Sequence, residues 1–346
     1  MTTSNAFDRL RIASTGFQEA SVLIAMAELD LGTQILERSN RATAADLSRA
    51  CNLDCRALTV LLDALVGLEY FIKVCSDSSD AHYSVAEPFV EPLDRRHPAT
   101  FIPMLRHQGN CLRSWSQLAR VVTDGTPAQK HASILGADED NVSFILAMNA
   151  IGQSVAGTMV EDLKQHGVLD FAREHIRFLD IGGASGTYTL AFLKTLPHAE
   201  GTIFDLPLAI REARKRFAGT PLESRVSFVE GDFYQHEFPT NFDLAWLSAI
   251  IHQHGRTESQ ALYAKVYRAL NPGGRIAVRD FVMGPNRTSP PMGTLFGINM
   301  LVGTRNGMVY TEGEISADLS AAGFINVRLA VPAETMSAVV AAEKPN

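Results

Sequence analysis

The stretch that decides the fold is Phe178-Leu179-Asp180-Ile181-Gly182-Gly183-Ala184-Ser185-Gly186-Thr187. An apolar run ends in an acid and a glycine-rich turn, and a helical pattern follows. Such a strand, turn and helix let a nucleotide-like ligand approach the backbone closely at the carboxyl end of the first strand. The stretch does not match the dinucleotide fingerprint GxGxxG, because Ala184 stands where that motif needs a glycine, so NAD is disfavoured.

From residue 177 onward the chain alternates apolar strands with amphipathic helices. This alternation predicts a doubly wound α/β domain with a mostly parallel seven-stranded sheet. Strands are expected at 177–181, 201–204, 226–230, 242–247, 274–281, 326–330 and 337–342, and helices at 189–196, 208–217, 258–270 and 314–322. The last two strands are separated by a short turn-like stretch, so we expect them to be antiparallel.

Acidic residues stand at the carboxyl ends of the first three strands. Asp205 ends the second strand, 25 residues after Asp180. This separation is close to the spacing of about 20 residues, counted from the glycine turn, at which a carboxylate meets ribose hydroxyls. Asp232 follows the third strand in Gly231-Asp232-Phe233, where it can accept from an adenine amino group while Phe233 packs on the ring. A carboxylate near the glycine turn also suits a cationic amino-acid head or a sulfonium better than a pyrophosphate.

Two helices and a hairpin are expected in the first 98 residues. Thr43 is a plausible N-cap for a helix over 44–51, and a second helix over 56–68 carries leucines on one face. The segments 70–74 and 82–85, with a polar turn at 76–80, predict a β-hairpin. This order is typical of a helix-turn-helix-wing, or winged-helix, domain.

Winged helices often bind DNA, so a DNA-binding regulator is one alternative. Between residues 43 and 68, however, Arg49 and Arg56 are the only bases, against three aspartates, and the chain carries a net charge of -7. A recognition helix needs several bases for phosphate contacts. We therefore favour dimerisation for this region and expect no nucleic-acid partner.

The sequence predicts neither export nor a membrane anchor. The first residues are polar, without the basic and apolar segments of a signal peptide. The apolar run at 23–27 is ended by Glu28 and Asp30, far short of the roughly 20 apolar residues that a membrane span needs. We expect a cytoplasmic protein with reduced cysteines.

Taken together, these motifs resemble class I S-adenosylmethionine-dependent O-methyltransferases of the plant caffeate type and the bacterial polyketide type. Besides the glycine turn, the resemblance is carried by Phe204-Asp205-Leu206-Pro207, Gly231-Asp232-Phe233, Ile251-His252 and Ala269-Leu270-Asn271-Pro272-Gly273-Gly274-Arg275. It covers nearly the whole chain. It implies a homodimeric enzyme with a winged-helix dimerisation domain at 1–98, a helical linker layer at 99–165 and a methyltransferase domain at 166–346.

The resemblance also implies which residues bind S-adenosylmethionine. They are Asp180, Gly182, Gly183, Gly186, Asp205, Leu206, Asp232, Phe233 and Ser248. Ser248 stands where the family often has a lysine near the methionine part of the cofactor.

His252, just past the fourth strand, matches the family's catalytic base. A phenol of pKa about 10 is mostly protonated at neutral pH, and a neutral imidazole of pKa about 6.5 can take its proton as attack proceeds. His254 is a rival two positions on. Asp280 falls where a carboxylate is expected to orient the base, whereas the second carboxylate that the family often has is missing near Val309.

The methyl acceptor is expected to be a small aromatic or polyketide-like hydroxyl compound, without a metal, because no Asp/Asp/Asn cluster follows the fourth strand. Where the family commonly has Asp-Trp after the histidine, this chain has Gln253-His254, so the substrate-side wall is expected to differ. N-methylation or non-methylating chemistry is the alternative within the fold. Candidate acceptor contacts are Phe144, Met148, Asn149, Phe296, Asn299 and Met300.

Overall fold

The computed structural model describes residues 3–74 and 81–346. The chain forms two compact units. The first unit runs to Arg113 and includes Lys130–Met148, and the second unit comprises Ser114–Gln129 and Asn149–Asn346.

A seven-stranded sheet forms the centre of the second unit, in the order β11-β12-β8-β7-β4-β5-β6. Strand β12 is antiparallel to both of its neighbours, and the other neighbouring pairs are parallel. The α/β fold and the antiparallel last pair are therefore confirmed, and the sheet is mixed. The strands are β4 (Arg177–Ile181), β5 (Glu200–Asp205), β6 (Val226–Glu230), β7 (Phe242–Ser248), β8 (Leu270–Asp280), β11 (Ile325–Val331) and β12 (Ala338–Glu343).

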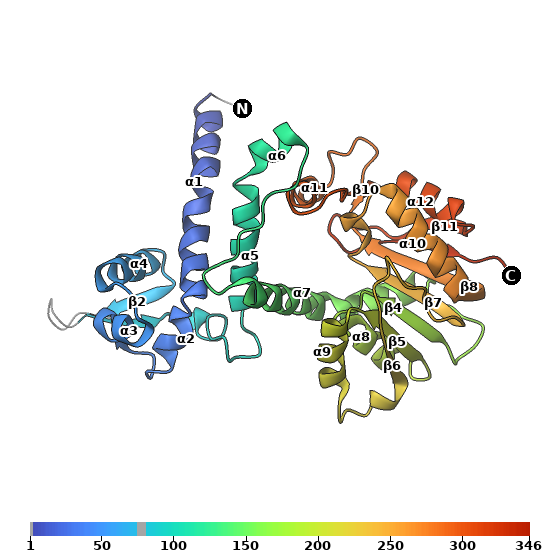
Figure 1. Ribbon diagram of the computed structural model, residues 1–346, viewed down its shortest axis with the longest axis horizontal. Helices are drawn as coiled ribbons and strands as arrows, with labels where there is room; N and C mark the ends of the chain where they lie inside the picture. The colour runs from blue at the N-terminus through green and yellow to red at the C-terminus, as the bar shows by residue number, and fades with distance from the viewer. Residues whose placement is uncertain (1–2, 75–80) are drawn as a thin grey trace. The chain divides into compact units, whose positions relative to one another are not determined.

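Helices cover both faces of this sheet, and the central strands are therefore buried on both sides. Figure 1 shows α8 (Thr187–Thr195) and α9 (Pro207–Phe217) on one face and α10 (Arg256–Ala269) and α12 (Glu312–Ala321) on the other. Phe192, Trp246 and Ala277 belong to the core on the α8 side, which also takes in the end of α7 (Ala137–Gln165). Leu247, Val278 and Leu262 belong to the core on the α10 side.

Strand β8 begins earlier than the predicted 274–281. Helix α10 ends at Ala269 and Leu270 already pairs with Phe242, before a register shift brings Arg275 opposite Leu244. The intervening Asn-Pro-Gly-Gly segment is thus an irregularity within the strand. The smaller elements of the second unit are α6 (Leu118–Asp124), η2 (Glu223–Arg225), η3 (Ile251–Gln253), β9 (Val282–Met283), α11 (Pro291–Gly303) and β10 (Tyr310–Thr311).

In the first unit, the predicted helices and hairpin strands lie close to their expected positions. Thr43 accepts from the backbone N–H of Asp46 in a capping box, as its predicted N-cap role requires. The turn predicted at 76–80 and Cys75 lie outside the described residues. The elements are α1 (Thr3–Glu28), α2 (Leu31–Leu36), β1 (Ala42–Thr43), α3 (Ala44–Cys51), α4 (Cys55–Gly67), β2 (Phe71–Val74), β3 (His82–Val85), η1 (Glu87–Phe89) and α5 (Ile102–Trp115), with sheet order β1-β3-β2.

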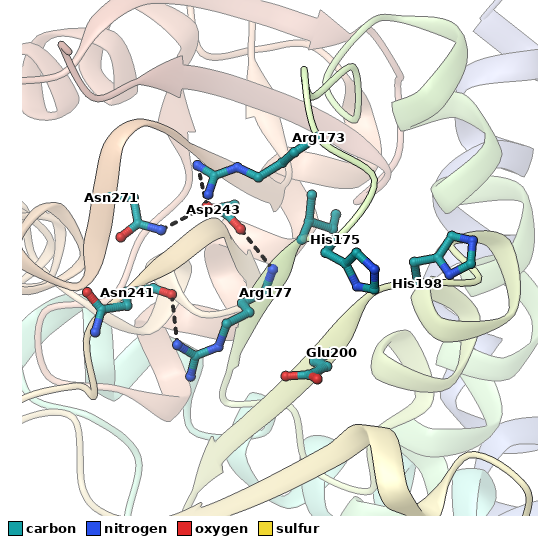
Figure 2. Close-up of a pocket in the computed structure, with 9 residues that line it drawn as sticks. Arg173, His175, Arg177, His198, Glu200, Asn241, Asp243 and Asn271 are labelled. Atoms are coloured by element: carbon teal, nitrogen blue, oxygen red, sulfur yellow. Dashed lines mark hydrogen bonds and ion pairs between the residues drawn. The ribbon is translucent and has the colours of Figure 1, made fainter.

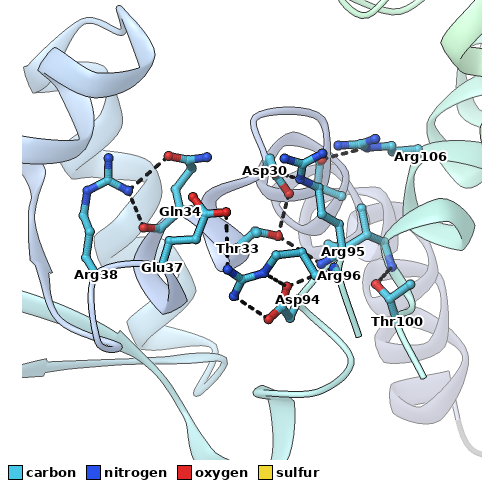
Figure 3. Close-up of polar contacts among 12 residues, drawn as sticks. Asp30, Thr33, Gln34, Glu37, Arg38, Asp94, Arg95, Arg96, Thr100 and Arg106 are labelled. Carbon is cyan, nitrogen blue, oxygen red and sulfur yellow. Dashed lines mark hydrogen bonds and ion pairs between the residues drawn. The ribbon is translucent and has the colours of Figure 1, made fainter. Parts of the chain in front are cut away.

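A polar network fastens α2 to the turn that precedes α5 (Figure 3). The buried Thr33 hydroxyl donates to Asp30 at 2.7 Å and accepts from the backbone N–H of Arg95 at 3.0 Å. Arg95 also pairs with Asp30 at 2.7 Å. These contacts have a structural role, because the two made by Arg95 join separate segments of the first unit.

Two long helices expose much apolar surface. Helix α1 carries Phe7, Leu10, Ile12 and Phe17, all more than half exposed. Among the described residues, α7 is the one helix long and apolar enough to cross a membrane, and 22% of its most apolar window is buried. The exposed apolar residues of α7 are Val142, Phe144, Leu146 and Ile151.

Candidate active site

The glycine-rich turn after β4 takes an unusual backbone path. Gly182, Ala184 and Gly186 have φ values of 68°, 48° and 75°, in the left-handed region that glycine adopts most readily. The Gly182 N–H donates to the Phe204 carbonyl at 2.8 Å. A Cβ on Gly182 would lie 2.5 Å from Ile250, so only a bare backbone fits there.

Asp205 joins this turn to the end of β5. Its carboxylate accepts from the backbone N–H of Ala184 at 2.8 Å and from that of Leu206 at 2.7 Å. Burial raises the pKa of Asp205, and these two hydrogen bonds oppose the rise. Leu206 itself is 54% exposed. The predicted ribose carboxylate therefore lies at the rim of the glycine turn.

Asp180 lies beneath the turn. It is buried and accepts from the Thr189 hydroxyl at 2.6 Å. Burial, opposed by the Thr189 bond and reinforced by the nearby Asp205 charge, raises the pKa of Asp180 to about 7. A Cβ on Gly183 would lie 2.7 Å from the Asp180 carboxyl carbon. In this position Asp180 supports the turn, and direct contact with a ligand stays a prediction.

Asp232 and Phe233 occupy the loop after β6. The Asp232 carboxylate accepts from the Tyr234 N–H at 2.8 Å and from the Gln235 amide at 2.9 Å, which fixes the loop. The half-buried Phe233 ring contacts the rings of Tyr234 and His254. The loop thus presents a carboxylate beside an aromatic ring, and the contact of these two residues with adenine stays a prediction.

His252 and Asp280 form a close pair. The His252 Nδ1 atom lies 2.9 Å from both carboxylate oxygens of Asp280. Only 12% of the His252 side chain and 2% of the Asp280 side chain are exposed. A carboxylate can only accept, so in the neutral imidazole Nδ1 carries the proton and Nε2 carries the lone pair. The Phe281 N–H also donates to Asp280 at 2.8 Å, which fixes the carboxylate's orientation.

Although His254 follows His252 by only two residues in the sequence, its side chain contacts a different loop. Its ring packs against Phe233 and Tyr234, on the loop after β6. Burial lowers the pKa of the His254 imidazole to about 4. Neither ring nitrogen has a hydrogen-bond partner within the described residues. The Gln253-His254 departure therefore alters the predicted adenine side of the site.

Three acceptor candidates come from α11. The Phe296 ring packs edge-on against His252, with centroids 4.8 Å apart. Asn299 accepts from the Trp115 indole N–H at 2.9 Å, and Met300 is buried. Val309, where the family's second carboxylate was expected, is buried in a cluster with Phe296. Phe296 is thus the candidate in contact with the histidine.

The remaining acceptor candidates come from α7. Phe144 and Met148 belong to the first unit, where Phe144 contacts the His107 ring. Asn149 belongs to the second unit, and its carbonyl oxygen accepts from three donors on the turn and on α9. These donors are Ser185 Oγ at 2.8 Å, Thr187 Oγ1 at 2.7 Å and Arg216 Nη1 at 2.8 Å. Asn149 therefore fastens α7 to the glycine turn.

Ser248 has a charged partner that the sequence analysis did not single out. The Arg279 guanidinium donates to the Ser248 hydroxyl at 3.1 Å. Arg279 is buried although it is charged. The available signal was an arginine that follows the apolar residues Ile276, Ala277 and Val278 of the strand.

A separate cleft of about 320 Å³ lies at the opposite edge of the sheet, by the amino ends of β4, β5 and β7. Figure 2 shows Asp243 at the centre of this cleft. Its carboxylate forms an ion pair with the Arg173 guanidinium at 2.9 Å and accepts a hydrogen bond from the Asn271 side-chain amide at 2.8 Å. The buried Asp243 also accepts from the Arg177 N–H. These contacts hold the strand starts together, and none of the predicted site residues lies in this cleft.

Comparison with known proteins adds three findings. A family model described as an O-methyltransferase domain matches residues 115–325. The chain is similar to the tetracenomycin polyketide synthesis 8-O-methyl transferase of Streptomyces glaucescens, at 28% identity over 90% of this chain and 89% of that protein. The acetylserotonin O-methyltransferase of Gallus gallus is also 28% identical, over 91% of each chain.

A solved structure gives the same picture at the level of the fold. Human N-acetylserotonin methyltransferase, solved in complex with S-adenosylmethionine, aligns with a TM-score of 0.77 and 23% identity over 100% of both chains.

Proposed function

This chain belongs to the O-methyltransferase domain family, and on that basis we propose that it moves a methyl group from S-adenosylmethionine to a hydroxyl of an aromatic or polyketide-like small molecule. The observation that carries the proposal is the His252–Asp280 pair at the same sheet edge as the glycine turn. The tetracenomycin relative, named for a polyketide pathway, supports the choice of acceptor class.

The residues at the strand ends fit the cofactor. The bare turn at Gly182 leaves room for close approach, the Asp205 carboxylate lies at its rim, and Phe233 offers a ring beside Asp232. When bound, S-adenosylmethionine supplies an electrophilic methyl group on a sulfonium. We assign the adenosine part to Asp205, Asp232 and Phe233, and the methionine part to the turn and Ser248.

We assign the role of general base to His252. Asp280 holds the Nδ1 proton, so the Nε2 lone pair can accept the proton of the acceptor hydroxyl as its oxygen attacks. The imidazolium that forms is stabilised by the same carboxylate. Phe296, packed against the His252 ring, limits how the imidazole can turn.

The test is the His252→Ala variant. We expect the transfer of labelled methyl to a panel of phenols to fall about 10²-fold or more, while affinity for S-adenosylhomocysteine stays within about twofold. His198→Ala removes an exposed histidine at the opposite edge and should leave both quantities unchanged. Normal turnover in His252→Ala would show that another group takes the proton.

Product mass from paired phenol and aniline acceptors separates transfer to oxygen from transfer to nitrogen. We also propose that the reaction needs no metal, so that turnover persists in excess chelator. Loss of turnover on chelation, restored by a divalent cation, would contradict this.

The proposal extends to assembly. We assign residues 1–98 to a winged-helix dimerisation domain, 99–165 to a helical linker layer and 166–346 to catalysis. The exposed apolar residues of α1 and α7 support a homodimer, since a lone chain would leave them in water. The free thiols of Cys51, Cys55 and Cys111 support a reducing, cytoplasmic location.

A further inference from the structure

Arg279 is a buried cation whose hydrogen-bonding groups are only partly used. The residue is 6% exposed. Its Nη1 donates to Ser248, its guanidinium lies over the Tyr188 ring at 5.4 Å, and its Nε has no partner within the described residues. The Tyr188 hydroxyl is also buried, on the same side of the sheet as Ser248.

No carboxylate in the described part of the chain lies within ion-pair distance of Arg279. The next residue, Asp280, faces the other side of the sheet, because successive strand residues alternate and Ala277 and Val278 belong to opposite cores. Arginine keeps its charge in proteins, and a buried charge without a counter-ion is strongly destabilising. An anion at this position would remove that penalty.

The place of this cation points to the anion. Arg279 pairs with Ser248 at the carboxyl ends of β8 and β7, and β7 is the neighbour of β4, which leads into the glycine turn. Tyr188 lies in the first turn of α8, directly after that turn. Arg279 therefore lies at the edge where the cofactor is proposed to bind.

We propose that Arg279, with Ser248 and Tyr188, binds the carboxylate of the methionine part of S-adenosylmethionine. The inference rests on the proposed function. That carboxylate is the one anionic group of the cofactor, and a guanidinium suits it because its N–H groups can pair with both oxygens. Ser248 lacks the charge of the lysine that the family often has there, and Arg279 supplies a cation from the neighbouring strand.

The experiment is calorimetric titration with S-adenosylhomocysteine and with its decarboxylated analogue. We expect the wild-type chain to prefer the carboxylated ligand by about tenfold or more, as for a hydrogen bond to a charged group. Arg279→Met should lose that preference by weakening only the carboxylated ligand. Ser248→Lys in the Arg279→Met background should restore it, because the ammonium then enters from β7.

The outcomes separate the two proposals. If the wild-type chain binds neither ligand, the proposed function fails and this inference fails with it. If it binds both equally, or if Arg279→Met keeps the preference, the inference alone is overturned. The wild-type comparison needs no variant, so the inference stays testable even if Arg279→Met does not fold.

Discussion

Among single residues, the proposed role of His252 depends on which of its two ring nitrogens carries the lone pair. Asp280 contacts Nδ1 alone, through two oxygens at 2.9 Å, and so leaves Nε2 for the acceptor. Both residues could be placed from sequence, because the family resemblance assigns them, His252 just past one predicted strand and Asp280 near the end of another. Arg279 could not be assigned a role in this way, since its burial depends on Ser248 and Tyr188, which belong to other elements.

Asp280→Asn tests this arrangement. An amide can donate to Nδ1 and so allow the tautomer with the proton on Nε2, which cannot accept a proton from the acceptor. We expect methyl transfer to fall about 10²-fold or more, with unchanged affinity for S-adenosylhomocysteine. Asp243→Asn, a buried aspartate at the opposite sheet edge, controls for loss of stability. Full activity in Asp280→Asn would contradict the tautomer argument.

Asp180 and His254 give opposite pH dependences of stability. Burial raises the pKa of Asp180 to about 7, so the folded chain binds more protons there than the unfolded chain and loses stability as pH rises towards 7. Burial lowers the pKa of His254 to about 4, so its contribution is present above about pH 6.5 and is lost as pH falls towards 4.

Between about pH 4 and 6.5 the two contributions oppose each other, each by at most about 1.4 kcal/mol per pH unit. Relative to the wild-type chain, the free energy of unfolding of Asp180→Asn should rise more steeply with pH, and that of His254→Phe less steeply. Urea unfolding at several pH values in this window measures both slopes. Identical slopes in all three chains would show that these groups titrate alike in the folded and unfolded states.

At the scale of elements, the glycine turn does more than leave space for a ligand. A Cβ on Gly186 would lie 2.6 Å from the Phe217 ring and 2.7 Å from Ile203, so this glycine lets the start of α8 pack closely against both β5 and α9. The sequence predicted the turn but not this packing, because the neighbours come from later elements. Asn149 illustrates the same limit, because the sequence does not show which face of α7 contacts the glycine turn.

Gly186→Ala and Gly125→Ala form a matched pair. Both glycines have positive φ, 75° and 67°, but a Cβ on Gly125 would meet nothing within 4 Å. Each change should cost about 1–2 kcal/mol in backbone strain, and Gly186→Ala should cost about 1–3 kcal/mol more from overpacking. Equal destabilisation of the two variants in urea unfolding would rule out the packing role.

At the scale of the whole molecule, the charge and the apolar surface indicate different partners. The net charge of -7 gives no general attraction to nucleic acid or an anionic membrane.

The fold of the catalytic region was predictable because strand and helix alternate regularly. Helix α1 was not predicted, since its apolar residues do not follow one narrow stripe.

Light scattering tests the proposed homodimer. Phe7, Leu10 and Phe17 lie within one face of α1 by helical spacing and are 72%, 70% and 57% exposed. We expect a dimer for the wild-type chain and a monomer for Phe7→Glu combined with Phe17→Glu. Val60→Glu, at a comparably exposed apolar position on α4, should remain dimeric. A monomeric wild-type chain would refute the assignment.

Cofactor binding at the glycine turn is tested by a calorimetric titration of the wild-type chain with S-adenosylhomocysteine. We expect saturable binding of one ligand per chain, because one set of strand ends carries the glycine turn, Asp205 and Phe233. Absence of binding at millimolar ligand would contradict it.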